Sequence, residues 1–360
     1  MISSTEQAFP SLDRRQWSGC NFLLFVTWAS LVRRENMENS SGMWLSRCLV
    51  GLVLLSFGVL CLRGSARAGH VFIVSIDGGK PAVISRSTMP VLQRLAAEGS
   101  STWTASTVFP SLTLPAHASM LTGVMPAKHK IFWNSWEPSA GVVGVPTVFS
   151  EAKAAGYGTA MFVGKEKFLH LVRSGSVDCF SYHRDRSHEV VKPIAGTNQL
   201  ERSLSVAARI VAEDASNYIR TNKPNLCFIH FTDPDDTGHQ YGWGSPEQIR
   251  AFGEVDAALG LVLKAIEDAG IVSESVVIVT ADHGGHGKEH GLNIPEDMMI
   301  PWIVWGKHVS RGITINVPVS TCDTAATALW LLGIALPDSF DGKPVLTAFE
   351  PRTPTQARAR

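Results

Sequence analysis

Residues 71–77 read Val-Phe-Ile-Val-Ser-Ile-Asp, and residues 276–284 read Val-Val-Ile-Val-Thr-Ala-Asp-His-Gly. Each segment is a short, largely β-branched apolar run that ends in a polar turn, the pattern of a strand buried on both faces. Residues 157–163 and 226–231 are similar runs. Between these runs, apolar periodicity predicts helices over 89–98, 199–221 and 252–269. Strands that alternate with helices predict an α/β fold, a three-layer sandwich with a mostly parallel central sheet.

Composition limits the classes of function. The chain has 360 residues, which is long for one domain but within reach of a single large α/β core. Lys plus Arg and Asp plus Glu each number 32, so the net charge is zero. That balance argues against nucleic-acid binding, which draws on an excess of basic residues. With 45% hydrophobic and 18% charged residues, the chain is neither disordered nor a polytopic membrane protein.

The N-terminal region differs from the rest of the chain. Residues 48–62 carry no charge, follow a short basic start, and precede Ala66-Arg67-Ala68, a small-x-small pattern. Such a stretch is typical of a signal peptide and is shorter than the roughly 20 residues that span a bilayer. We therefore predict a signal peptide, or a retained signal anchor, over 43–68, and an exported domain, periplasmic or secreted, over 69–360. Residues 1–42 have no place before a signal, so we interpret them as a mis-assigned N-terminal extension.

Acidic residues follow three of the predicted strands: Asp77, then Asp233 and Asp235, then Asp282. The carboxyl ends of parallel strands share one edge of a sheet, so these side chains should meet there. A single Asp after a strand is a common turn residue. Several carboxylates in one crevice repel one another, and a bound cation relieves that repulsion.

Histidines accompany these acids. Asp235 and His239 lie four apart on what we expect to be one loop, and His283 follows Asp282 directly. His286 and His290 come next, in a glycine-rich run. Mixed oxygen and nitrogen ligands suit zinc, manganese or iron better than magnesium or calcium.

A third feature is a short helix expected to begin just beyond Thr113, with Pro115 in its first turn and Gly123 as its cap. A hydroxyl at a helix N-terminus faces unpaired N–H groups, which is a natural place for a phosphate. From the local sequence alone, a simple helix cap is the favoured interpretation of Thr113. Nearby, Lys128 and Lys130 can contact an anionic substrate, although a solvated loop is the simpler interpretation.

Together these motifs resemble the type I phosphodiesterase/nucleotide pyrophosphatase family of the alkaline phosphatase superfamily. The resemblance rests on Ile76-Asp77-Gly78, the Thr113 helix, Asp233-Pro-Asp-x-x-Gly-His239 and Ala281-Asp-His-Gly284, and it extends over about residues 71–345. It implies an alkaline-phosphatase-like hydrolase with two zinc ions, with manganese or iron as alternatives. The implied reaction cleaves a small phosphodiester or phosphoanhydride through a phospho-threonine intermediate.

The resemblance also assigns residues. One zinc would be held by Asp77, Thr113, Asp282 and His283, and the other by Asp235, His239 and His290. His286 is the alternative to His290. Thr113 would be the nucleophile, and Asn134 would help to hold a phosphoryl oxygen, together with backbone N–H groups near Leu114.

Three positions depart from the family pattern. Leu114 replaces an aromatic residue after the nucleophile, and only a short loop separates His283 from His290, so we expect no large cap insertion. Lys130 replaces a glycine, which we expect to alter that turn. These departures weaken the case for nucleotides and leave three alternatives open. A phosphomonoesterase or a phosphonate hydrolase would use the same metal site, whereas a non-catalytic extracytoplasmic binding domain would not need Thr113. A sulfatase would need a Cys or Ser nucleophile in place of Thr113.

Overall fold

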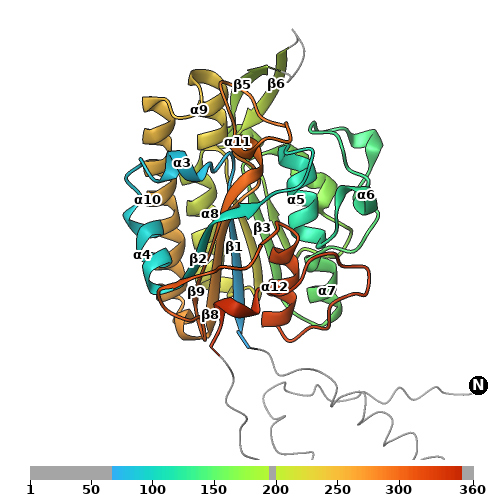
Figure 1. Cartoon of the computed structure of the whole chain (residues 1–360). Helices are drawn as coiled ribbons and strands as arrows, with labels where there is room; N and C mark the ends of the chain where they lie inside the picture. Colours follow the sequence, from blue (N-terminus) through green and yellow to red (C-terminus); the bar gives the residue numbers. More distant parts are fainter. Residues whose placement is uncertain (1–66, 194–199, 351–360) are drawn as a thin grey trace, which may run out of the picture. The chain divides into compact units, whose positions relative to one another are not determined.

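The computed structural model describes residues 67–193 and 200–350 (Figure 1). The predicted extension over 1–42 and all but the last two residues of the predicted signal over 43–68 lie outside the described residues, so both stay predictions. Arg67 and Ala68 are already attached to the domain, because their backbone N–H groups donate to the carbonyl of Leu331 at 2.7 and 3.0 Å. Within the described ranges, no helix has the length and apolar character needed to cross a bilayer.

The centre of the described domain is one eight-stranded sheet, which confirms the predicted fold class. Five neighbouring pairs are parallel, and β9 runs antiparallel between its two neighbours. In sheet order the strands are β10 (Ile313–Thr314), β2 (Ser100–Ser106), β9 (Met299–Gly306), β8 (Ser275–Ala281), β1 (His70–Ile76), β7 (Leu226–Phe231), β3 (Thr159–Val163) and β4 (Cys179–Ser181).

Helices cover both faces of this sheet, as Figure 1 shows. One face carries α4 (Pro90–Glu98), α8 (Ala208–Asn222) and α10 (Pro246–Asp268), and the other carries α5 (Thr113–Thr122), α7 (Val148–Ala154) and α12 (Asp323–Leu331). The remaining helices of the described residues are α3 (Pro81–Ile84), α6 (Pro126–His129), α9 (Asp233–Tyr241) and α11 (Pro295–Met298). The 3-10 turns are η1 (Pro138–Ala140), η2 (Glu166–Leu171), η3 (Arg184–Arg186), η4 (Val272–Glu274) and η5 (Leu346–Ala348).

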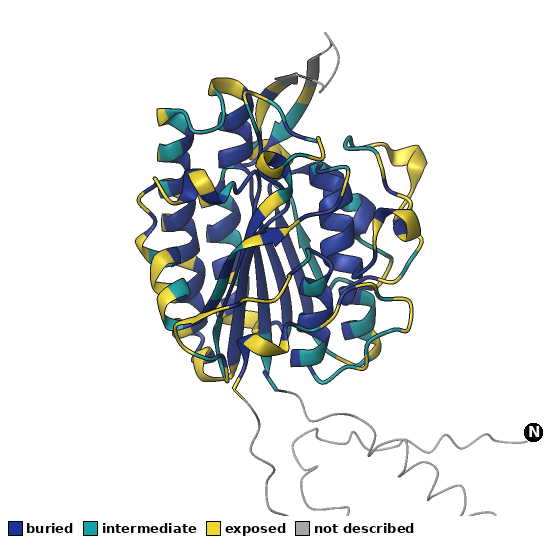
Figure 2. Cartoon of the chain, viewed as in Figure 1, coloured by how far each residue is buried: buried dark blue, intermediate teal, exposed yellow. Residues whose placement is uncertain are grey.

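Two hydrophobic cores lie on the two faces of the sheet. Strand alternation divides β1 between them: Val71 and Ile73 pack in one core, and Phe72, Val74 and Ile76 pack in the other. The central strands are buried along almost their whole length (Figure 2). This rigid sheet fixes where its carboxyl-end loops lie.

One local prediction was wrong. The helix expected over 199–221 is shorter, because residues 200–205 form β6 (Leu200–Ser205) and pair with β5 (His188–Pro193) in an antiparallel hairpin. Lys130 itself takes the left-handed conformation in its turn, with φ of 64°, and whether this turn differs from that of the family stays a prediction. The cap predicted at Gly123 is confirmed. Its φ is 69°, and a side chain there would come within 2.4 Å of the Phe340 ring.

Candidate active site

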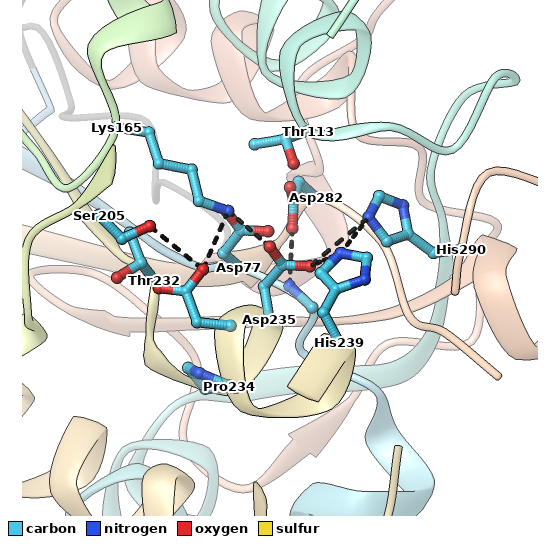
Figure 3. A network of polar contacts seen from close by, with 12 residues as sticks. Asp77, Thr113, Lys165, Ser205, Thr232, Pro234, Asp235, His239, Asp282 and His290 are labelled. Atoms are coloured by element: carbon cyan, nitrogen blue, oxygen red, sulfur yellow. Dashed lines mark hydrogen bonds and ion pairs between the residues drawn. The ribbon is translucent and has the colours of Figure 1, made fainter. Parts of the chain in front are cut away.

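The predicted acids meet at the carboxyl edge of three adjacent strands. Asp77 follows β1, Asp282 follows β8, and Asp235 follows β7, while β1 lies between β8 and β7 in the sheet. All three carboxylates are fully buried, and Figure 3 shows them converging. The parallel topology alone therefore explains why residues far apart in the sequence gather at one place.

Asp235 and His239 lie on a helix rather than on the expected loop. Asp235 lies in the first turn of α9 and His239 in its last turn. Pro234 and the three acidic residues of the first turn are all favourable at a helix N-terminus. A spacing of four places both side chains on one helix face. Nε2 of His239 accordingly lies 3.1 Å from Oδ1 of Asp235.

A first group of potential metal ligands consists of Asp77, Asp282 and His283. Nε2 of His283 lies 3.3 Å from Oδ1 of Asp77 and 3.2 Å from Oδ2 of Asp282. The other oxygen of Asp282 accepts hydrogen bonds from the backbone N–H groups of Gly78 and His283, at 3.1 and 3.0 Å. These bonds fix the carboxylate so that its Oδ2 faces the imidazole.

A second group lies beside the first. Nε2 of His290 lies 3.1 Å from Nε2 of His239 and 3.5 Å from Oδ1 of Asp235. The rings of His283 and His290 stack, with centroids 3.6 Å apart. His286, the alternative ligand, is directed elsewhere, because its Nδ1 lies 2.7 Å from Oδ1 of Asp297.

The three clustered imidazoles share one orientation. Nδ1 lies within hydrogen-bond distance of a backbone carbonyl in each: Gly284 for His283, Lys288 for His239 and Ser111 for His290, at 2.8, 2.8 and 2.9 Å. Donation from Nδ1–H leaves the Nε2 lone pair directed into the cluster, the tautomer that a metal ligand requires.

The donor set fits divalent cations. Oδ1 of Asp77 and Oδ2 of Asp282 are buried and accept no hydrogen bond. Burial and the neighbouring Asp77 raise the pKa of Asp282 well above its usual range. Burial and His283 lower the pKa of His290, which keeps that imidazole neutral. Buried carboxylate oxygens and imidazole nitrogens are ligands that zinc binds in proteins.

Thr113 is the first residue of α5 and does not cap the helix. The N-cap position belongs to Leu112, and no side-chain cap is formed. Oγ1 of Thr113 instead lies 3.4 Å from Nε2 of His283, at the edge of the first ligand group. His117, one turn along, lies with Nδ1 2.7 Å from the Thr113 carbonyl and so fixes the helix start. The hydroxyl is thus held against the cluster at a helix N-terminus.

Asn134 also reaches this helix start, but in an unexpected way. Its Oδ1 accepts a hydrogen bond from the backbone N–H of Leu114 at 2.9 Å. That N–H group, which we expected to contact a phosphoryl oxygen, is therefore already used. The bond instead holds the Asn134 amide next to Thr113.

Lys165 was missed by the sequence analysis. This lysine follows β3, is fully buried, and lies with Nζ 2.6 Å from Oδ2 of both Asp77 and Asp235 (Figure 3). Burial alone would lower the pKa of Lys165, but Asp235, Asp77 and Asp236 raise it well above the ordinary value. The strand-edge rule that identified the acids would have found this residue too, had it been applied to cations. Lys128, by contrast, forms a surface ion pair with Asp341.

A cavity of about 370 Å³ adjoins the cluster at Lys165. Its wall is formed by the residues after Asn134, by the turn after β3 and by the β5–β6 hairpin. Residues that line it include Ser135, Trp136, Lys167, Arg184 and Arg202. Two of its basic groups are paired, because Arg184 contacts Glu166 and Arg202 contacts Glu189, at 3.4 and 3.0 Å.

Comparison with known proteins agrees with this fold. The family model for type I phosphodiesterase/nucleotide pyrophosphatase matches residues 71–298, so the chain belongs to that family, as its motifs indicated. It is 23% identical over 239 residues to the murine bis(5'-adenosyl)-triphosphatase enpp4, covering 60% of this chain and 47% of that protein. It is 27% identical over 169 residues to the murine steryl-sulfatase, covering 38% and 27%.

A solved structure extends the comparison. The fold matches murine ectonucleotide pyrophosphatase/phosphodiesterase 5, an inactive threonine-to-alanine variant in complex with AMP, with a TM-score of 0.63. Sequence identity is 15%, and the match covers 78% of this chain and all of that one. The chain spans about half of the triphosphatase and about a quarter of the sulfatase.

Proposed function

We propose that this protein is a metal-dependent hydrolase of phosphodiester or phosphoanhydride bonds that works through a phospho-Thr113 intermediate. The observation that carries the proposal is the position of the Thr113 hydroxyl, at a helix N-terminus and 3.4 Å from Nε2 of His283. A threonine with a purely structural role would cap the helix, and this one does not. Family membership and the inactive threonine variant of a relative agree with this role.

Seven residues would hold two zinc ions, with manganese or iron as alternatives. Asp77, Thr113, Asp282 and His283 would hold one, and Asp235, His239 and His290 the other. When bound, the ions lower the pKa of the threonine hydroxyl and stabilise charge on the phosphoryl and leaving oxygens. His290 is preferred to His286 because its Nε2 lies within the cluster, whereas His286 contacts Asp297.

Thr113, Asn134 and the α5 N-terminus would each have a separate role in the reaction. Oγ1 of Thr113 forms a bond to phosphorus while the bond to the leaving oxygen breaks, and the threonine proton ends on that oxygen. The oxygen of a water molecule then forms a bond to phosphorus as the bond between phosphorus and Oγ1 breaks, and one water proton returns to Oγ1 of Thr113. The α5 N-terminus faces the phosphoryl group and favours its negative charge. The amide of Asn134, held by Leu114, would donate to a phosphoryl oxygen through Nδ2.

Replacing Asn134 with alanine tests this last role. We expect N134A to lower kcat about 10²-fold, because one donor to the transition-state charge is lost, with little change in zinc content. The matched control is N217A, since Asn217 is exposed on α8 and its Oδ1 accepts a hydrogen bond from Arg220 at 3.3 Å. Steady-state kinetics with metal analysis checks both variants. Equal activities in N134A and N217A would remove Asn134 from the reaction.

The reaction class can be tested with two chromogenic esters. We expect purified protein with zinc to have a higher kcat/KM for bis-p-nitrophenyl phosphate than for p-nitrophenyl phosphate. The cavity beside Lys165 offers room for a second substituent on phosphorus, which a monoester lacks. The opposite preference would favour the phosphomonoesterase alternative, with the same metals and the same nucleophile. Sulfate esters are not expected substrates, because Thr113 stands where a sulfatase has Cys or Ser.

A further inference from the structure

We infer that Lys165 is a positioning residue, a fixed positive charge that joins the two metal half-sites and holds them in place before metal binds. The inference rests on the proposed function only in taking Asp77 and Asp235 as ligands of different metal ions. It concerns the assembly of the site and not the reaction that the site performs.

The backbone around Lys165 is built for a close approach. Gly164 precedes it at the end of β3, and a side chain on this glycine would come within 2.3 Å of Cγ2 of Thr232. The turn after β3 can therefore pack directly against Thr232, which links β7 to α9. Asp235 lies in the first turn of α9. The carbonyl of Gly164 accepts a hydrogen bond from Val206 N–H at 2.9 Å, and Lys165 itself pairs with Ser205. Both contacts fix the lysine backbone.

The ammonium group contacts the carboxylate oxygens that face away from the imidazoles of His239, His283 and His290. It bonds Oδ2 of Asp77 and Oδ2 of Asp235, both at 2.6 Å. His230 adds a second contact to Oδ2 of Asp77 at 3.0 Å. The opposite oxygens are the ones turned toward the histidines: Oδ1 of Asp77 toward His283, and Oδ1 of Asp235 toward His239. Lys165 thereby fixes the rotation of both carboxylates and leaves the metal-facing oxygen of each in position.

The positive charge of Lys165 also reduces repulsion among the neighbouring carboxylates. Four buried carboxylates surround this region: Asp77, Asp235, Asp236 and Asp282. Lys165 bonds two of them and lies 3.9 Å from Oδ1 of a third, Asp236. Its ammonium therefore offsets carboxylate repulsion in the metal-free protein, a task that the divalent ions share once they bind. Loss of the lysine should accordingly matter most when metal is absent.

The test measures thermal stability with and without zinc for Lys165→Met, which keeps the length of the side chain and removes its charge. In the metal-free protein we expect K165M to lower the Tm by about 6–10 °C. With two equivalents of Zn²⁺ the difference from the wild-type Tm should shrink to less than half. The zinc-induced rise in Tm is thus larger in K165M than in the wild type. An equal loss with and without zinc, or no loss, would overturn the inference.

Two further variants complete the design. Lys153→Met removes a lysine that pairs with Asp178 at 2.6 Å on the surface, and it should lower the Tm by only a degree or two, independently of zinc. Lys165→Arg keeps the charge and should recover most of the metal-free Tm. If K165M folds only with zinc, the inference is supported; if it folds in neither condition, Lys165 has a general role in folding and the inference fails. Because turnover is not measured, a protein that binds zinc without hydrolysing esters would overturn the proposed function alone.

Discussion

Thr113→Ala is expected to lower kcat/KM for a phosphodiester by at least about 10³-fold, because the reaction loses the oxygen that forms the covalent intermediate. The fold should persist, since α5 is otherwise buried against the sheet and the threonine makes no cap. Kinetics under zinc saturation, with circular dichroism to check the fold, measures the effect. Rapid quench with a labelled substrate should show a phosphorylated chain in the wild type and none in T113A.

The control for this variant is the same substitution at the other end of the same helix. Thr122 is buried, its hydroxyl donates to the carbonyl of Ala118 at 2.6 Å, and it lies away from the cluster. T122A should lower thermal stability with little effect on kcat. T113A should lower kcat with little effect on thermal stability. Thr113→Ser, which restores a hydroxyl, should recover part of the activity. If T113A keeps a tenth or more of the wild-type activity, the phospho-threonine route is wrong. If the wild-type protein itself has no activity, the alternative of a non-catalytic binding domain gains support.

His290→Ala should reduce bound zinc from two ions toward one per chain and lower kcat/KM by at least about 10²-fold. Its Nε2 lies 3.1 Å from that of His239 and is held there through Nδ1 by the Ser111 carbonyl. Residues that only orient metal ligands typically change metal affinity by about 10–100-fold when mutated. Loss of one of three direct ligands should lower the affinity for the metal ion by more than this. Metal analysis after dialysis measures the stoichiometry.

His286→Ala is the matched control, four residues away in the same glycine-rich loop. His286 contacts Asp297 at 2.7 Å and stays outside the cluster, so H286A should keep both ions. Asp297 also accepts a hydrogen bond from Leu292 N–H, which maintains the loop without His286. Loss of zinc in H286A with retention in H290A would reverse the two assignments.

The acid cluster could be predicted from the sequence because the carboxyl ends of parallel strands share one edge of a sheet. Asp77 and Asp282 follow strands whose apolar runs are unmistakable, and a parallel sheet must bring such residues to one edge. The same reasoning did not show that Asp235 and His239 lie on a helix. A strand followed by Thr-Asp-Pro-Asp-Asp reads as a turn, yet Pro234 and the acidic residues are equally good at a helix start.

Tertiary pairing explains the other failures. Residues 200–205 have an ambiguous local pattern, and they form a strand because β5 is present to pair with them. Lys165 was overlooked because a lysine side chain is ordinarily solvated, as that of Lys128 is. What makes it different is the direct approach of the turn after Gly164 to Thr232, a long-range contact that no local pattern encodes.

The backbone carbonyls that orient the three imidazoles have a consequence for how such sites diverge. Many metal sites use an acidic side chain for this task, and a mutation there releases the ligand. Here the acceptors at Ser111, Gly284 and Lys288 belong to the main chain. Any residue that preserves the loop at position 288 keeps His239 in its tautomer. Loop sequences around this centre can therefore change under selection for new substrates while the imidazoles keep their orientation.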